Sequence, residues 1–502
     1  MGENSIRLRY SGFIVFVAKV LSIFTGLLFQ LMIVRVITPE DYGVWFNVND
    51  VVAYFTIFAG VFPFWALRFT ARSKAGAVKT CFAANSVVAS IAALIYLSLT
   101  PVVTSLLKVD VKYFAVYVLA VVYLVEVYLL NSLESCLQAL KPHTLGYGLL
   151  LSEACKLVAA FALIVFGRLS LMGAIVSVTL GVAVQLIYYL KLLVYKLRER
   201  VRWSYVREWL KGSIANIYNI IGGQLASSIF IMLFIYGGEA ARGYYGAAAQ
   251  IASVITYSSF LAFALYPKLL AEGERQDVAT SLRTVLMFAI PMTGGIIAIP
   301  ESYMIVLKSE YAEAWPILIV LALDSLILTI NAVLSYALYG LEKIDERAQI
   351  PLKKLVKSKL FTAFSLPYIH AAITLPTAYL TLSTYSGENP IHAALKISII
   401  NTIARSLTLT ILYRMVHNAT IIGISWKTVG KYVAASIIMA LILHFGLIPH
   451  PRRIYQILTM AMLGGVIYMG ILLTIEPEAR RLTERIWKEA ISKITSMHSR
   501  VH

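Results

Sequence analysis

Long apolar runs separated by short polar connections dominate the hydrophobic pattern of this chain. A helix that crosses the hydrocarbon core of a bilayer needs about 20 mainly apolar residues. Runs of that length predict an all-α polytopic membrane protein with about 14 transmembrane helices. They cover residues 12–34, 43–66, 80–104, 112–135, 145–167, 170–194, 213–236, 244–267, 281–303, 314–338, 360–383, 391–414, 430–448 and 454–475.

The stretch 37-ITPEDYGVW-45 has the pattern of a helix start. Thr38 suits the N-cap position, and Pro39 suits the first helical residue, whose N–H has no partner within the helix. The acidic Glu40 and Asp41 favour the positive end of the helix dipole. We therefore expect this stretch to begin the second helix.

A similar stretch, 243-GYYGAAAQIA-252, returns about two hundred residues later. When Tyr42-Gly43 is aligned with Tyr245-Gly246, polar residues spaced i, i+3 and i+7 fall on one face of both helices. They are Asn47, Asp50 and Tyr54 in the first helix and Gln250, Ser253 and Tyr257 in the second. The match predicts two six-helix lobes in a parallel pseudo-two-fold repeat, as in some transporters, followed by two extra C-terminal helices.

The polar connections divide the chain into predicted domains. These are an N-terminal lobe (1–195), a basic cytoplasmic linker (196–212), a C-terminal lobe (213–416), two additional transmembrane helices (417–475) and a cytoplasmic amphipathic tail (476–502). The linker interleaves arginines with Trp203, Tyr205 and Trp209, a pattern that suits the membrane interface. Two interpretations stay open for it: an interfacial linker helix, or a docking site for lipid phosphates.

Composition supports the membrane assignment. The chain is 59% hydrophobic and 14% charged, whereas a soluble protein is usually about a quarter charged. Its net charge of +18 arises because basic residues gather in alternate connections, which predicts cytoplasmic N- and C-termini in the cell membrane. The basic charge therefore indicates anionic membrane lipids as partners rather than nucleic acid, and we expect a monomer.

Enzyme signatures are missing from the sequence. It contains no P-loop and no zinc-protease motif, so neither a catalytic site, a metal nor a cofactor is expected. Cys81, Cys136 and Cys155 fall inside predicted helices at spacings that match no metal motif. They are expected to be small buried apolar residues.

Charged residues inside apolar helices are the candidate functional residues, because a charge in a bilayer is costly and usually faces a cavity or a partner. Candidate substrate-binding residues in a cavity are Lys19, Asp50, Arg68, Lys156, Gln250 and Arg405. Candidate ion-coupling residues are Asp50, Glu153 and Asp324. The acids Glu126 and Glu134 share roughly one face of a helix.

Structural alternatives remain for these residues. Lys19 either faces a cavity or extends to the inner interface. Glu153 and Lys156, at i and i+3, either form a self-neutralising pair or belong to a substrate site. Each acid is either the structural partner of a basic neighbour or a proton carrier, and topology alone explains Arg68 equally well.

The chain resembles the multidrug/oligosaccharidyl-lipid/polysaccharide (MOP) flippase superfamily, particularly its polysaccharide-transporter branch. The resemblance is carried by Arg35 and 37-ITPEDYGVW-45, by 243-GYYGAAAQIA-252, and by the pattern of twelve plus two helices. It implies two lobes around a central cavity, alternating access, and no enzymatic activity. It further implies flipping of polyprenyl-diphosphate-linked oligosaccharide to the outer leaflet, with basic residues holding the headgroup and H+ or Na+ as candidate coupling ions.

Two other classes of protein are alternatives. A cation-coupled exporter of small drugs or metabolites, similar to the multidrug and toxic compound extrusion (MATE) branch, would favour an acidic cavity. A membrane-embedded polymerase or ligase usually carries a large loop or outer domain, which this chain lacks.

Overall fold

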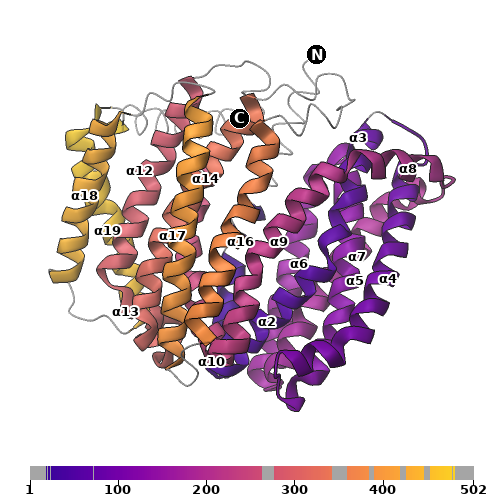
Figure 1. Ribbon diagram of the computed structural model, residues 1–502, viewed down its shortest axis with the longest axis horizontal. Helices are drawn as coiled ribbons and strands as arrows, with labels where there is room; N and C mark the ends of the chain where they lie inside the picture. The colour runs from indigo at the N-terminus through magenta and orange to yellow at the C-terminus, as the bar shows by residue number, and fades with distance from the viewer. Residues whose placement is uncertain are drawn as a thin grey trace, which may run out of the picture. The chain divides into compact units, whose positions relative to one another are not determined.

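The computed structural model describes residues 18–19, 21–22, 24–71, 73–262, 276–341, 359–383, 389–418, 425–445, 453–477 and 479–480. Regular secondary structure in these residues is entirely helical, which confirms the predicted all-α fold (Figure 1). Ten of the described helices are long and apolar enough to cross a membrane. The bent pair Pro39–Phe55 and Ile57–Thr70 raises that number to eleven if it forms one span, so the predicted count of fourteen is not confirmed.

The helices before residue 240 are Phe24–Val36, α2 (Pro39–Phe55), η1 (Ile57–Gly60), α3 (Val61–Ala71), α4 (Ala77–Leu106), η2 (Val111–Tyr113), α5 (Phe114–Leu140), α6 (His143–Ala160), η3 (Phe161–Phe166), α7 (Ser170–Leu197), α8 (Trp203–Gly212) and α9 (Ile214–Gly237). The later helices are α10 (Glu239–Ala252), η4 (Ser253–Ala262), α12 (Gln276–Ala298), α13 (Pro300–Leu307), η5 (Ser309–Ala314), α14 (Trp315–Leu341), α16 (Lys359–Ser383), α17 (Pro390–His417), α18 (Trp426–Phe445) and α19 (Ile454–Ile475).

The described residues form two compact units. The first unit holds those of residues 1–246 and 364–400, and the second holds those of residues 247–349, 358–363 and 401–502. The tail predicted at 476–502 lies almost wholly outside the described residues.

The first unit is built on α3, α4, α5 and α7, which pack against one another, with α6 packed on α7. Its core gathers large side chains that are fully buried, among them Trp209, Tyr189 and Leu133. In the second unit, α12 packs against α14 and α18, and α19 packs on α18. Apolar burial of this kind positions the polar side chains described below.

Several helices break where the sequence predicts continuous spans. The predicted helix 43–66 is divided into α2, η1 and α3, and the predicted helix 244–267 changes from α10 to the 3₁₀ segment η4. The predicted helix 281–303 is interrupted at Pro300, which cannot donate a helical hydrogen bond. The second helix of each predicted lobe therefore carries a 3₁₀ segment near its middle.

The predicted linker helix forms as α8. Trp209 is fully buried and packs edge-on against Phe69, with ring centroids 5.5 Å apart. The Arg202 N–H donates to the Thr80 hydroxyl at 2.8 Å, while Trp203 stays exposed. Trp209 thus anchors this helix, and its arginine, Arg207, is exposed.

Candidate functional site

The start of α2 has the predicted cap. The Thr38 hydroxyl accepts a hydrogen bond from the Asp41 N–H at 3.2 Å, and the Asp41 carboxylate accepts one from the Thr38 N–H. This reciprocal pair is a capping box that satisfies two N–H groups at the helix start. The helix begins at Pro39, as expected from the sequence.

Each residue of the polar stripe predicted on α2 contacts a partner in the same unit. Tyr117 donates a hydrogen bond to the side-chain amide oxygen of Asn47, and the Tyr54 hydroxyl lies 2.7 Å from the Ser228 hydroxyl. Asp50, between them, is held by Arg242. The stripe therefore connects α2 to α5, α9 and α10.

The Asp50–Arg242 ion pair is nearly enclosed. Both the Nε and an Nη of Arg242 reach Oδ2 of Asp50, at 2.9 and 2.8 Å, and the two side chains are 6% (Arg242) and 19% (Asp50) exposed. The guanidinium also lies over the rings of Phe46 and Phe230, at 4.8 and 5.0 Å from their centroids. Aromatic faces and a carboxylate together replace the water that a buried cation loses.

The N-terminal ends of α2 and α10 cross backbone to backbone. A Cβ at Gly43 would overlap the Glu239 carbonyl, and one at Gly243 would overlap the Pro39 carbonyl. These reciprocal contacts make Pro39 correspond to Glu239 and Gly43 to Gly243. Corresponding residues are therefore 200 positions apart in the structure, whereas the sequence alignment placed them 203 positions apart. The two similar stretches thus meet each other, and glycine is required on both sides.

Glu153 and Lys156 form the self-neutralising pair considered from the sequence. Lys156 Nζ lies 2.7 Å from Oε1 of Glu153, with 15% and 12% of the two side chains exposed. The Thr25 hydroxyl donates to the other carboxylate oxygen at 2.6 Å, and the Lys156 ammonium lies 5.2 Å from the Phe29 ring centroid. The pair is thereby tied to the helix Phe24–Val36.

Lys19 is exposed and interacts electrostatically with Glu134 of α5. Glu134 accepts a hydrogen bond at 2.9 Å from Gln185, which also donates to the Tyr189 hydroxyl at 2.9 Å. The hydroxyl of Tyr189 in turn reaches the Leu145 carbonyl at 3.2 Å. This second network joins α5, α6 and α7.

In the second unit, Arg405 of α17 pairs with Asp324 of α14. Arg405 Nε lies 3.2 Å from Oδ1 of Asp324, and the side chains are 19% and 8% exposed. Thr402, one turn before Arg405, also hydrogen-bonds to the Asp324 carboxylate. Two residues predicted for separate roles, headgroup contact and ion coupling, therefore belong to one site.

The other candidates lie apart from these pairs. The Arg68 guanidinium stacks on aromatic rings of its own helix, 4.9 Å from the Phe64 centroid and 5.6 Å from that of Trp65. Gln250 is half-buried in α10, and its carbonyl accepts a hydrogen bond from Ser253 at 2.7 Å. Neither residue joins the ion pairs described above.

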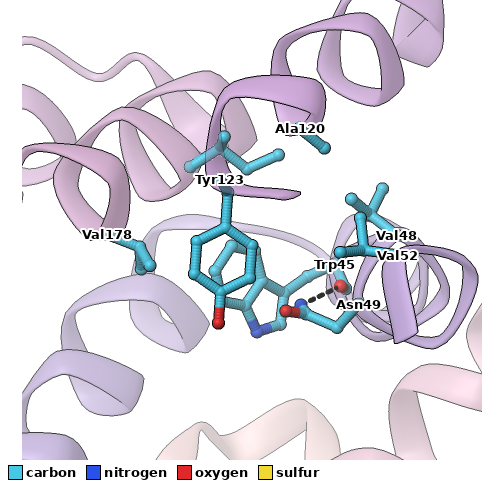
Figure 2. A pocket seen from close by; sticks show the side chains of 8 residues that line it. Trp45, Val48, Asn49, Val52, Ala120, Tyr123 and Val178 are labelled. Carbon is cyan, nitrogen blue, oxygen red and sulfur yellow. Dashed lines mark hydrogen bonds between the residues drawn. The ribbon is translucent and has the colours of Figure 1, made fainter. Parts of the chain in front are cut away.

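A small, partly open pocket with room for about one water molecule lies between α2, α5 and α7. Figure 2 shows Tyr123 of α5 beside Trp45 and Asn49 of α2, with Val178 on the opposite wall. The Asn49 amide donates to the Trp45 carbonyl at 2.7 Å. The lining is mostly apolar, with an amide, an indole and a phenol as its polar groups.

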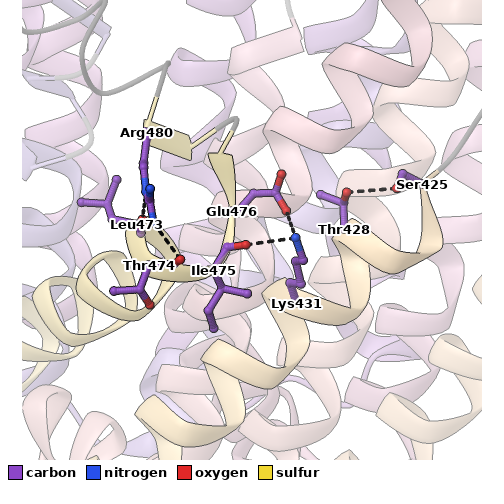
Figure 3. A network of polar contacts seen from close by, with 8 residues as sticks. All are labelled: Ser425, Thr428, Lys431, Leu473, Thr474, Ile475, Glu476 and Arg480. Atoms are coloured by element: carbon purple, nitrogen blue, oxygen red, sulfur yellow. Dashed lines mark hydrogen bonds and ion pairs between the residues drawn. The ribbon is translucent and has the colours of Figure 1, made fainter.

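A separate polar network closes the end of α19 (Figure 3). Lys431 of α18 lies 2.9 Å from the Glu476 carboxylate and donates to the Ile475 carbonyl at 3.0 Å. Arg480 donates to the carbonyls of Leu473 and Thr474. Cations thus satisfy the last carbonyls of this helix and complement the negative end of its dipole.

Outside the spans, Glu199 joins the end of α7 to the start of α4. Burial acts against its charge, but Lys196 at 2.8 Å and the Gly76 N–H both donate to its carboxylate. With Arg202 adding to the attraction, these contacts hold the pKa of Glu199 below its usual value.

The structure gives Asp50 and Arg405 partners that the sequence does not indicate. The sequence pattern puts Arg242 in an outer connection, and it marks neither Thr25 nor Gln185 as functional. The partners are distant in the chain, and Arg242 lies 192 residues from Asp50. The sequence does offer one signal for Arg242, because it precedes Gly243, the residue that corresponds to Gly43 in the crossing of α2 and α10. No group of three metal-ligating side chains occurs among the residues that the structure describes.

Known structures share this arrangement of helices. The lipid II flippase MurJ, in an inward closed conformation, matches with a TM-score of 0.67 at 14% identity, over 91% of this chain and 97% of that one. An inward-facing multidrug resistance MATE family transporter of the MOP superfamily matches with a TM-score of 0.58 at 15% identity, over 79% of this chain and 94% of that one. This chain has the MOP superfamily fold.

A third MOP-type structure extends the comparison. The MATE multidrug transporter DinF-BH matches with a TM-score of 0.54 at 14% identity, over 82% of this chain and 97% of that one. No protein-family model matches the chain, and no curated protein matches it in sequence. The resemblance is therefore confirmed at the level of the fold.

Proposed function

We propose that this chain is a membrane transporter that flips a polyprenyl-diphosphate-linked oligosaccharide from the cytoplasmic to the outer leaflet. The observation that carries this proposal is the match to the lipid II flippase MurJ, which extends over 91% of the chain. The MATE transporters match less of it, 79% and 82%, at lower TM-scores. The breadth of the likeness favours a flippase over an exporter.

The charge pairs suggest how such a headgroup is held. Arginine can bind phosphate through two parallel hydrogen bonds, and the Nε of Arg405 already lies beside a carboxylate oxygen of Asp324. A diphosphate would take the place of that acid as the partner of the guanidinium. Lys19, which is exposed, would provide a second cation without displacing a hydrogen bond. The lipid tail would remain in the bilayer while the headgroup crosses.

The proposed transport cycle uses the predicted topology. The predicted lobes, 1–195 and 213–416, would alternate in giving the headgroup access from each side of the membrane. The bias of basic residues towards alternate connections supports cytoplasmic N- and C-termini. H+ or Na+ would provide the driving force.

Export of small drugs or metabolites is the second candidate function. The described spans do not form a uniformly basic interior, because Asp50, Glu153 and Asp324 each face a cation. An interior with balanced charges and the additional acid Glu126 suits a cationic cargo better than a basic interior would.

Depletion of the protein from its own cells tests the proposal. Mass spectrometry of the membrane lipids should show accumulation of a polyprenyl-diphosphate-linked sugar on depletion. Cells that express a version with Gly223→Ala, a position with open space around it, should show the normal lipid profile. An unchanged lipid profile together with new sensitivity to cationic drugs would instead support the exporter.

A further inference from the structure

Glu126 differs from the other acids inside the described spans. It lies near the middle of α5 with 7% of its surface exposed, and its Oε2 atom is buried without a hydrogen-bond partner. By contrast, Asp50, Glu153 and Asp324 face Arg or Lys, and Glu134 accepts from Gln185. The three acids that the sequence predicts for ion coupling are thus the paired ones.

Titratable groups on the elements around α5 are engaged elsewhere along it. On α2, Asp41 accepts from Tyr113 and Asp50 pairs with Arg242. On α3, Arg68 lies over Phe64, and on α4, Tyr96 donates to the Tyr117 carbonyl and Cys81 lies against Cys136. Tyr189 of α7 and Lys19 both lie at Glu134. In α6, Glu153 is held by Lys156. Tyr123, on α5 itself, is the described titratable group that interacts electrostatically with Glu126.

A carboxylate without a cation is costly in an apolar interior, so the group takes up a proton instead. Glu126 follows Tyr123 by three residues and therefore lies on the same side of α5, one turn away. Tyr123 lines the pocket in Figure 2, which has room for about one water molecule. Water in that pocket would need to advance by only one helical turn to solvate the carboxylate.

We propose that Glu126 is a proton-binding site, neutral in this conformation, that releases H+ to water advancing from the pocket beside Tyr123. In this step the O–H bond of the carboxylic acid breaks, the electron pair stays on the carboxylate, and water takes the proton. The use of this site to drive transport rests on the proposed function. The protonation itself does not, and it is measurable on the purified protein without substrate.

Infrared spectroscopy of the protein in liposomes tests the site. The wild type should show a carboxylic-acid C=O band at neutral pH that disappears as the pH is raised. Glu126→Gln should lack this band, whereas the matched control Glu134→Gln should keep it. Identical spectra for wild type and Glu126→Gln would overturn the assignment, as would a band that persists at every pH.

A second variant covers the case in which Glu126→Gln does not fold. Glu126→Asp keeps the carboxyl but shortens it, so the band should remain and its pH midpoint should move. A midpoint identical to that of the wild type would assign the band to another residue and overturn the proposal. No lipid-linked sugar is present in this experiment, so a negative result would not contradict the flippase function. Conversely, a normal lipid profile on depletion of the protein would not contradict the proton site.

Discussion

At the scale of single residues, the charges inside this protein act as pairs. Asp50 and Arg242 are mutually enclosed, and Arg242 also lies on aromatic rings. The coulombic attraction of such a pair roughly offsets the loss of hydration, so its presence adds little net stability. Removing one partner, however, leaves a buried charge uncompensated.

Arg242→Ala should therefore destabilise the protein by about 3–5 kcal/mol. The double variant Asp50→Asn with Arg242→Gln should recover much of that loss, because neither side chain is then charged. Thermal unfolding in detergent measures both variants. If the double variant unfolds as readily as Arg242→Ala, the aromatic contacts rather than the charge pair hold this position.

The pH dependence of stability can be assigned at Glu199, outside the spans. Its pKa is lowered in the folded protein, so its ionised form contributes stability above the usual carboxyl range, and that contribution is lost as the pH falls through the folded pKa. Glu199→Gln should lower the melting temperature at neutral pH, and the difference from wild type should shrink on acidification. A gap that stays constant with pH would mean that Glu199 acts through packing alone.

At the scale of elements, local chemistry was predictable and long-range partners were not. Thr38 and Asp41 specify the start of α2 within four residues, so the sequence suffices there. The break between α2 and α3 is different, because an apolar run carries no period that marks where a helix bends. The position of Arg242 is hidden for a similar reason: its partner lies 192 residues away, and only the fold brings the two together.

The contact between α2 and α10 gives a test at this scale. Gly43→Ala or Gly243→Ala places a methyl group against a backbone carbonyl that cannot move aside, so each should cost about 1–3 kcal/mol or more. Gly223→Ala, in a helix interior with no atom nearby, should be neutral or slightly stabilising. Melting temperatures that fall equally for all three would show that the loss arises from the helices themselves and not from their crossing.

At the scale of the whole molecule, composition and apolar run lengths predicted the fold class, and short motifs predicted the superfamily. The structural matches confirm the fold. The candidate site was predictable only as a set of charged residues. The sequence indicated Glu153 as a partner for Lys156 within one helix, but it left Arg405 without an acid, because pairing between helices depends on their packing.

Headgroup binding leads to a prediction for the two cations assigned to it. Lys19→Ala should lower flipping without loss of folded protein, because Lys19 is exposed. Arg405→Ala would leave Asp324 unpaired, so Arg405→Lys is the better variant: it keeps the charge but loses the planar fork that suits phosphate. It should also flip more slowly at normal protein levels. Normal flipping by both variants would remove these residues from the headgroup site.

Flipping in liposomes that contain only the purified protein and a polyprenyl-diphosphate-linked oligosaccharide is the most direct measurement. The sugar that becomes accessible to an added glycosidase reports transfer between leaflets. We predict that part of the sugar-bearing lipid is protected from the glycosidase in empty liposomes and becomes accessible when the wild-type protein is present. With Lys19→Ala, it should become accessible more slowly. Protection equal to that of empty liposomes, under every imposed H+ or Na+ gradient, would contradict the assignment of this chain as a flippase.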